Sequence, residues 1–160
     1  MNLVGRSTGR LLRRLLIGLI GVVAVVGTTA GPSNAAPYWQ TYHKTPSWHC
    51  GSPDNLFVGN GLFEVQACVV RSGAYVQAVM TITNTSTNAM VNWKIGDVER
   101  RITATGLVAS SDSCLASVLG PGQTRACFGR TLRDTRASYA HVSLWYVYGI
   151  FNMSANSPSA

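Results

Sequence analysis

The chain has 160 residues, of which 46% are hydrophobic and 12% are charged, and its formal net charge is +7 at pH 7. Four of its 13 basic residues lie within the first 14 positions, and the rest of the chain carries nine basic against six acidic residues, a charge of +3. So small a surplus gives no case for a nucleic-acid partner, and the length suits one domain with a hydrophobic core.

The first 36 residues have the order of a secretory signal peptide. A positive segment comes first, with Arg6, Arg10, Arg13 and Arg14. The uncharged run Leu15–Gly27 follows, and its 13 residues fall short of the roughly 20 that span a bilayer as a helix. Cleavage of this signal-peptide helix, residues 1–35, is predicted after Ala35, so the mature chain is secreted and extracellular with no stable membrane anchor. The arginine pair partly resembles a twin-arginine signal, and the export route stays open.

Four cysteines lie in the predicted mature chain, at Cys50, Cys68, Cys114 and Cys127. An even set outside the cytosol is most simply two disulfides, for which three pairings are possible. Cys50–Cys68 and Cys114–Cys127 are favoured, because each pair flanks a turn-rich stretch that brings its ends together. No C-x-x-C pair is present and the spacings match no common zinc pattern, so neither a metal nor a cofactor is expected.

The first half of the mature chain alternates apolar and polar residues, as half-buried strands do. Phe63–Val69 and Val76–Thr83 both follow this pattern, and Ser72-Gly73-Ala74 between them predicts a hairpin. A polar loop, Asn84–Asn88, comes next. A third strand is predicted over Val91–Ile95 and is expected to stop at Gly96-Asp97.

The second half is predicted to add three strands. The first covers Arg101–Val108, and Thr124–Thr131 follows the strongest turn of the chain, Leu119–Gln123, in which Pro and Gly set the backbone angles. Tyr139–Asn152 closes the domain, with Val142 and Leu144 on one face and Trp145 on the other. No mature segment shows helical periodicity. The expected fold is all-β, a single antiparallel immunoglobulin-like sandwich of about six or seven strands stapled by two disulfides.

The predicted organisation has four parts. The signal peptide, residues 1–35, precedes an aromatic and polar arm, residues 36–49. The sandwich covers residues 50–152, and a Ser/Asn/Pro tail, residues 153–160, is expected to be disordered.

Several motifs together resemble small secreted immunoglobulin-like sandwich proteins of high-GC Gram-positive bacteria. They are Trp48-His49-Cys50-Gly51, Phe63–Val70, Val79–Ser86 with its Asn-Thr-Ser ending, and Gly120–Gly129 with its Pro-Gly-Gln-Thr turn. The resemblance implies the fold, but most such proteins have no assigned activity. It therefore carries over no catalytic residue.

Two features are candidates for binding an extracellular protein or a cell-wall polysaccharide. The loop Gly120, Pro121, Gly122 and Gln123 is closed by the predicted second disulfide, so it loses little entropy on binding. Trp39 and Tyr42 on the arm are candidate aromatic contacts, because no periodicity points Trp39 inward. Three other aromatic positions are expected to fill the sandwich: Trp48, Trp93 and one of Trp145 or Tyr146.

A non-catalytic binding domain is therefore the leading hypothesis, and an inhibitor of a secreted amylase or protease is the alternative. The Trp-Arg-Tyr triplet of known amylase inhibitors is absent from the sequence, which counts against an amylase inhibitor. An enzyme would require the three histidines, His43, His49 and His141, to converge with acidic residues in one pocket. No catalytic residue is assigned.

Overall fold

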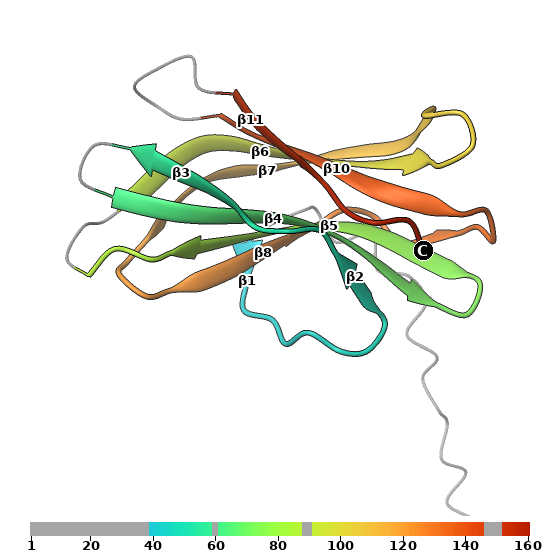
Figure 1. The fold of residues 1–160 in the computed structure, drawn as a ribbon, viewed down its shortest axis with the longest axis horizontal. Helices are drawn as coiled ribbons and strands as arrows, with labels where there is room; N and C mark the ends of the chain where they lie inside the picture. The colour runs from blue at the N-terminus through green and yellow to red at the C-terminus, as the bar shows by residue number, and fades with distance from the viewer. Residues whose placement is uncertain (1–38, 59–60, 88–90, 146–151) are drawn as a thin grey trace, which may run out of the picture. The chain divides into compact units, whose positions relative to one another are not determined.

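The computed structural model describes residues 39–58, 61–87, 91–145 and 152–160, and within these ranges the chain is all-β without a helix (Figure 1). The predicted antiparallel sandwich with two disulfides is confirmed. The predicted signal peptide lies outside the described residues. In the part of the chain described, no helix is long and apolar enough to cross a membrane.

Seven strands form one sheet, in the order β1-β8-β5-β4-β2, with β3 also pairing with β4 and β9 also pairing with β5. Their bounds are Trp39–Gln40 for β1, Trp48–Cys50 for β2, Asp54–Val58 for β3, Gly61–Ser72 for β4, Tyr75–Asn84 for β5, Thr124–Phe128 for β8 and Leu132–Arg133 for β9. The two long central strands, β4 and β5, contain the two strands and the hairpin predicted from alternation, and Gly73 supplies the positive φ of 59° in their turn.

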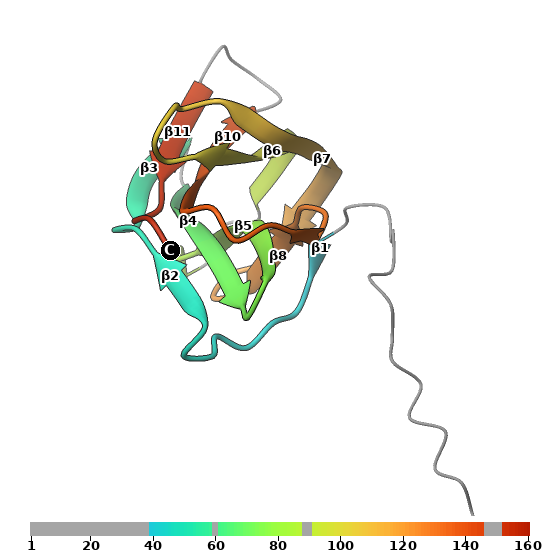
Figure 2. The same cartoon turned by 90° about the vertical axis from the view of Figure 1, so that its right-hand side faces the viewer.

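Four strands form the second sheet, in the order β11-β10-β6-β7. Their bounds are Val91–Ile102 for β6, Val108–Leu119 for β7, Ser138–Trp145 for β10 and Asn152–Asn156 for β11. Figure 2 shows this sheet as the upper layer above the strands of the seven-stranded sheet. The two layers enclose one apolar core, to which β4, β5, β6, β7, β8, β10 and β11 all contribute fully buried or nearly buried side chains.

The prediction that the third strand stops at Gly96-Asp97 is wrong, because β6 continues through this pair to Ile102. Glycine is required there by packing and not by a turn. A Cβ atom at Gly96 would lie 2.8 Å from the ring of Trp39 and would collide with the end of Met80. A glycine inside a strand commonly marks such a close approach.

The predicted strand Arg101–Val108 is also wrong, since only its ends lie in β6 and β7, and residues 103–107 form the turn of the β6–β7 hairpin. Gly106 adopts a φ of 67°, and its N–H donates to the carbonyl of Ile102 over 2.7 Å. The second strand of the hairpin, β7, was not predicted. Its sequence is rich in serine and lacks a clear apolar alternation, because its inward positions include Asp112 and Cys114.

The tail predicted to be disordered instead contains β11, which pairs with β10 along five residues. Ala155 is only 4% exposed and packs in the core. Beyond the strand, Ser138 and Ala160 exchange two backbone hydrogen bonds of 3.0 Å. Because backbone pairing and one small apolar residue hold this segment, its polar composition misled the sequence prediction.

A buried arginine ties the loop before β10 to the second sheet. Arg100 is 1% exposed, and its guanidinium donates to Asp134 over 2.7 Å and to the hydroxyl of Ser138 over 2.8 Å. The side chain and backbone N–H of Arg136 also donate to Asp134. The hydrogen bonds from Arg136 and then from Arg100 hold the pKa of the Asp134 carboxyl well below its usual range.

We predict that Asp134→Ala lowers the free energy of unfolding by about 3 kcal/mol at pH 7, because it leaves the buried Arg100 cation without its anion. The lowered pKa means that the stabilisation by Asp134 is complete above about pH 4 and is lost as the pH falls further. Denaturant unfolding should show that the difference in free energy of unfolding between variant and wild type is smaller at acidic pH than at pH 7. The matched change at exposed Asp54 should cost less than about 0.5 kcal/mol, and an equal loss in both variants would contradict the assignment.

Candidate functional site

The Cys114–Cys127 disulfide joins the two sheets. Cys114 lies on β7 of the four-stranded sheet and Cys127 on β8 of the seven-stranded sheet, with both residues fully buried and their Cα atoms 6.0 Å apart. The predicted pairing is confirmed, but the bond crosses the core and does more than close a local turn. It therefore restrains β7 and β8 relative to each other close to the turn that connects them.

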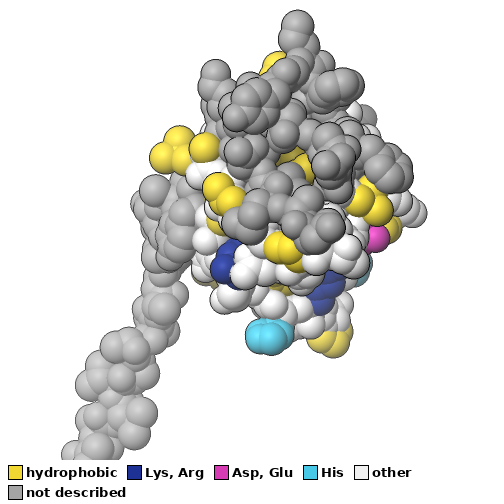
Figure 3. All heavy atoms as spheres, turned by 90° about the vertical axis from the view of Figure 1, so that its left-hand side faces the viewer, with side chains coloured by type: hydrophobic (Ala, Val, Ile, Leu, Met, Phe, Trp, Pro, Cys, Tyr) yellow, Lys and Arg dark blue, Asp and Glu magenta, His cyan; other side chains and the backbone are white. Residues whose placement is uncertain are grey.

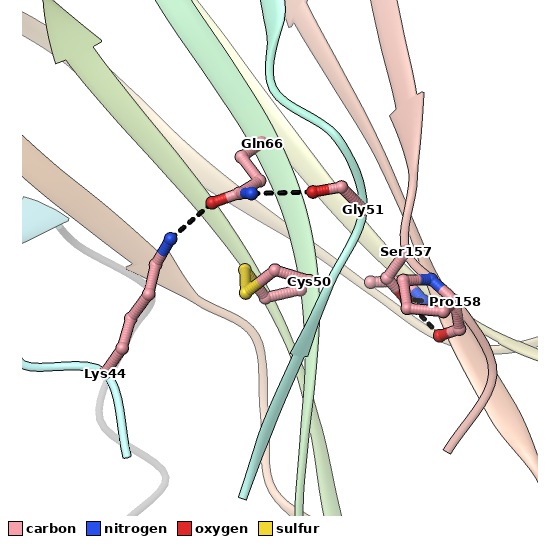
Figure 4. Close-up of a disulfide and its surroundings, with 8 residues drawn as sticks. Lys44, Cys50, Gly51, Gln66, Ser157 and Pro158 are labelled. Carbon is pink, nitrogen blue, oxygen red and sulfur yellow. Dashed lines mark hydrogen bonds between the residues drawn. A yellow bond between two sulfur atoms is a disulfide. The ribbon is translucent and has the colours of Figure 1, made fainter. Parts of the chain in front are cut away.

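The other predicted disulfide, Cys50–Cys68, is also confirmed and links neighbouring strands of one sheet. The two cysteines are register partners on β2 and β4, with Cα atoms 4.0 Å apart. Figure 4 shows Gln66 beside this bond, donating to the carbonyl of Gly51 over 2.6 Å and accepting from Lys44. The disulfide and these hydrogen bonds fasten the N-terminal segment to β4.

The N-terminal aromatic residues pack against the domain. Trp39 on β1 contacts the main core, and its indole N–H donates to the carbonyl of Leu115 over 2.7 Å. Tyr42 stacks on Trp48 at 5.3 Å, and Trp48 meets the ring of Phe128 edge-on at 5.8 Å. Burial raises the pKa of the Tyr42 hydroxyl, and a hydrogen bond with Thr81 opposes the shift.

These rings cover a small second core on the outer face of the seven-stranded sheet. Its fully buried members are Cys68, Val79 and Ala126. The predicted arm is therefore part of the folded domain over the residues described. Of the two candidate aromatic contacts, Trp39 packs against the main core and Tyr42 against this second core.

The predicted binding loop is a type II turn between β7 and β8. Pro121 and Gly122 occupy its two central positions, Gly122 has a φ of 68°, and the N–H of Gln123 donates to the carbonyl of Gly120 over 3.1 Å. The side chain of Gln123 folds back, so that its Oε1 accepts from the N–H of Gly120 over 2.9 Å. Side chain and backbone thus close the same turn.

Buried Asn84, at the end of β5, holds this turn through three hydrogen bonds. Its side-chain amide donates to the carbonyl of Leu119 over 2.9 Å. Its backbone N–H donates to the carbonyl of Gln123 over 2.9 Å, and its carbonyl accepts from the N–H of Gly122 over 2.8 Å. Asn84 was expected in a polar loop, and this role was not predicted. The Asn-Thr-Ser ending of the strand was the available signal, since such residues often bond to nearby backbone.

The turn is exposed at the end of the sandwich where several connections begin. The strand directions place the ends of β3, β5, β7 and β10 on the side that lies to the left in Figure 1. Pro121, Gly122 and Gln123 are exposed, and Val118 just before them is 55% exposed. Figure 3 views this end, where hydrophobic side chains appear in several places among polar atoms.

The three histidines lie on three different segments of the fold. His43 lies between β1 and β2, His49 on β2 of the seven-stranded sheet, and His141 on β10 of the four-stranded sheet, where its Nδ1 contacts Asn156 Oδ1 at 2.8 Å. Among the residues described, no group of three or more His, Cys, Asp or Glu side chains is arranged to hold a metal ion.

Comparisons with protein families, with curated proteins and with solved structures find no match for the chain. The function is therefore inferred from the geometry of the described residues.

Proposed function

We propose that the chain is a secreted, non-catalytic binding domain that contacts an extracellular protein through the turn Gly120–Gln123. The observation that carries this proposal is the exposed turn fixed by buried Asn84 through three hydrogen bonds. A segment already held in one conformation loses little entropy on binding, so more of its contact energy appears as affinity.

The chemistry of the turn favours a protein surface as the partner. Val118 and Pro121 offer apolar area, and the exposed backbone next to Gly122 lets a partner approach closely. Binding residues are often found on loops that a rigid scaffold positions, and the cross-sheet disulfide supplies that rigidity here.

An inhibitor of a secreted hydrolase is a second candidate, because a rigid protruding turn can enter and block an active-site cleft. The closed Gly120–Gln123 turn is the specific observation in its favour. The two candidates share a surface and differ in the partner, so identifying the partner decides between them.

Secretion is tested by the mass of the protein recovered from culture medium. We expect a chain that begins at Ala36 and is lighter than its reduced form by the four hydrogens of two disulfides. The disulfides observed suit an oxidising compartment. Recovery of a chain that retains Leu15–Gly27, or of free thiols, would contradict the predicted export.

Binding is tested with the mature chain as bait in culture supernatant, using a double change in the turn. We expect Val118→Ser with Pro121→Ala to weaken capture of the main partner at least about tenfold, a loss of about 1.4 kcal/mol. The control is Tyr75→Ser, because Tyr75 is also exposed but lies at the start of β5, far along that strand from Asn84.

Capture that survives the turn change and fails in the Tyr75 control would show that another surface binds. Unchanged circular dichroism of both variants verifies that they fold. If the captured partner is a hydrolase and the wild-type domain reduces its activity, the inhibitor candidate is the correct one.

A further inference from the structure

The two sheets differ in what covers their outer faces. The seven-stranded sheet is covered by the segment around Tyr42 and Trp48. On the four-stranded sheet, the outward residues of β10 alternate with buried Ala140, Val142 and Leu144, and they are half-buried up to Trp145, which is exposed. The last outward residue of β10, Trp145, is 40% exposed, and Tyr146, the other residue expected to fill the sandwich, lies outside the described residues.

The indole of Trp145 is held in place by a hydrogen-bonded chain of side chains across three strands. Its N–H donates to Asp97 Oδ2 over 3.2 Å on β6, and the hydroxyl of Ser113 on β7 donates to Asp97 Oδ1 over 2.6 Å. These bonds therefore restrain the orientation of the partly exposed ring. Fixing it beforehand lowers the entropy lost when a ligand stacks on it.

Asp97 keeps acceptor capacity for a ligand. A carboxylate offers about four lone-pair sites, and among the described side chains only Ser113 and Trp145 use them. The remaining sites lie beside the indole and can accept hydroxyl protons. An aromatic face next to unused carboxylate acceptors is suited to a sugar, whose C–H face stacks on the ring while its hydroxyls donate.

A second apolar group extends this surface across the sheet. Leu115 on β7 is 76% exposed, and the register pairs both Leu115 and Trp145 with position 95 of β6. They are thus two strand spacings apart, about 10 Å. Asp97 lies on β6 between them, two residues along from that row, so an oligosaccharide lying across the strands from Trp145 to Leu115 would have Asp97 beside it.

The charges of the face select against an anionic polymer. Glu99 is neutralised by Arg101, whose Nε and Nη2 both donate to Glu99 Oε2, at 2.9 and 2.6 Å. Among the described side chains of this face, Asp97 is the carboxylate left without a cation. Repulsion by Asp97 would disfavour an acidic sugar in contact with the same indole.

We propose that Trp145, Asp97, Ser113 and Leu115 form a binding site for an uncharged, linear oligosaccharide on the outer face of the four-stranded sheet. The site is separate from the turn Gly120–Gln123, so it adds a second ligand to the proposed binding domain.

Isothermal titration of the mature, disulfide-bonded protein with cellohexaose and with hexa-N-acetylchitohexaose tests the site. We expect at least one of these probes to bind, and which of them binds shows whether the site prefers a glucan or an N-acetylated glycan. A polygalacturonate hexamer should bind at least about tenfold more weakly than the neutral hexasaccharide that binds. Trp145→Ala should weaken binding at least about tenfold, and Trp145→Phe, which keeps a ring but loses the N–H, by less. Tyr75→Ala, at another exposed aromatic residue, should leave binding unchanged.

The proposal is overturned if neither neutral hexasaccharide binds the wild-type protein, or if Trp145→Ala binds as tightly as the wild type. Ser113→Ala provides a second variant if Trp145→Ala does not fold, and it should weaken binding because it frees Asp97 from its fixed orientation. Protein capture through the turn should persist in Trp145→Ala, so failure of the sugar site and failure of the proposed function give different results.

Discussion

The Cys114–Cys127 bond is the constraint on which the arrangement of the domain depends, since it connects the two sheets covalently through the core. With a sequence separation of 13, such a cross-link removes about 3 kcal/mol of chain entropy from the unfolded state in the simplest treatment. Trp39 lies beside it, because β1 pairs Trp39 with Cys127 while its indole bonds to the carbonyl of Leu115, one residue from Cys114. Gly96 leaves the space that this ring occupies.

This constraint also determines which surfaces are available to other molecules. The strands that leave the disulfide meet at the Gly120–Gln123 turn, and Asn84 fixes the turn to β5 of the seven-stranded sheet. The N-terminal segment, held by Trp39 and by the Cys50–Cys68 bond, covers one outer face. On the outer face of the other sheet, Trp145 is partly exposed. Rigidity at the turn and preorganisation of the indole have the same consequence, a low entropic cost of binding.

The sequence was sufficient to predict features that depend on local pattern. Alternation identified the β4–β5 hairpin, and the spacing of cysteines with turn residues identified both disulfides. Features set by contacts distant in sequence were not predictable in this way. The Trp39–Leu115 hydrogen bond spans 76 residues. This contact makes the aromatic segment part of the packed domain, and it explains why position 96 is a glycine inside a strand and not a strand end. Serine-rich β7 and polar β11 are held by backbone pairing to their neighbours, which composition does not show.

Backbone ¹⁵N relaxation measures most directly whether the exposed turn is as rigid as the sheets that carry it. We expect order parameters of about 0.85 for the amides of Gly122 and Gln123, equal to those of β5 and lowered by Asn84→Ala. Values below about 0.6 in the wild-type protein would show that the turn is flexible and not held by Asn84.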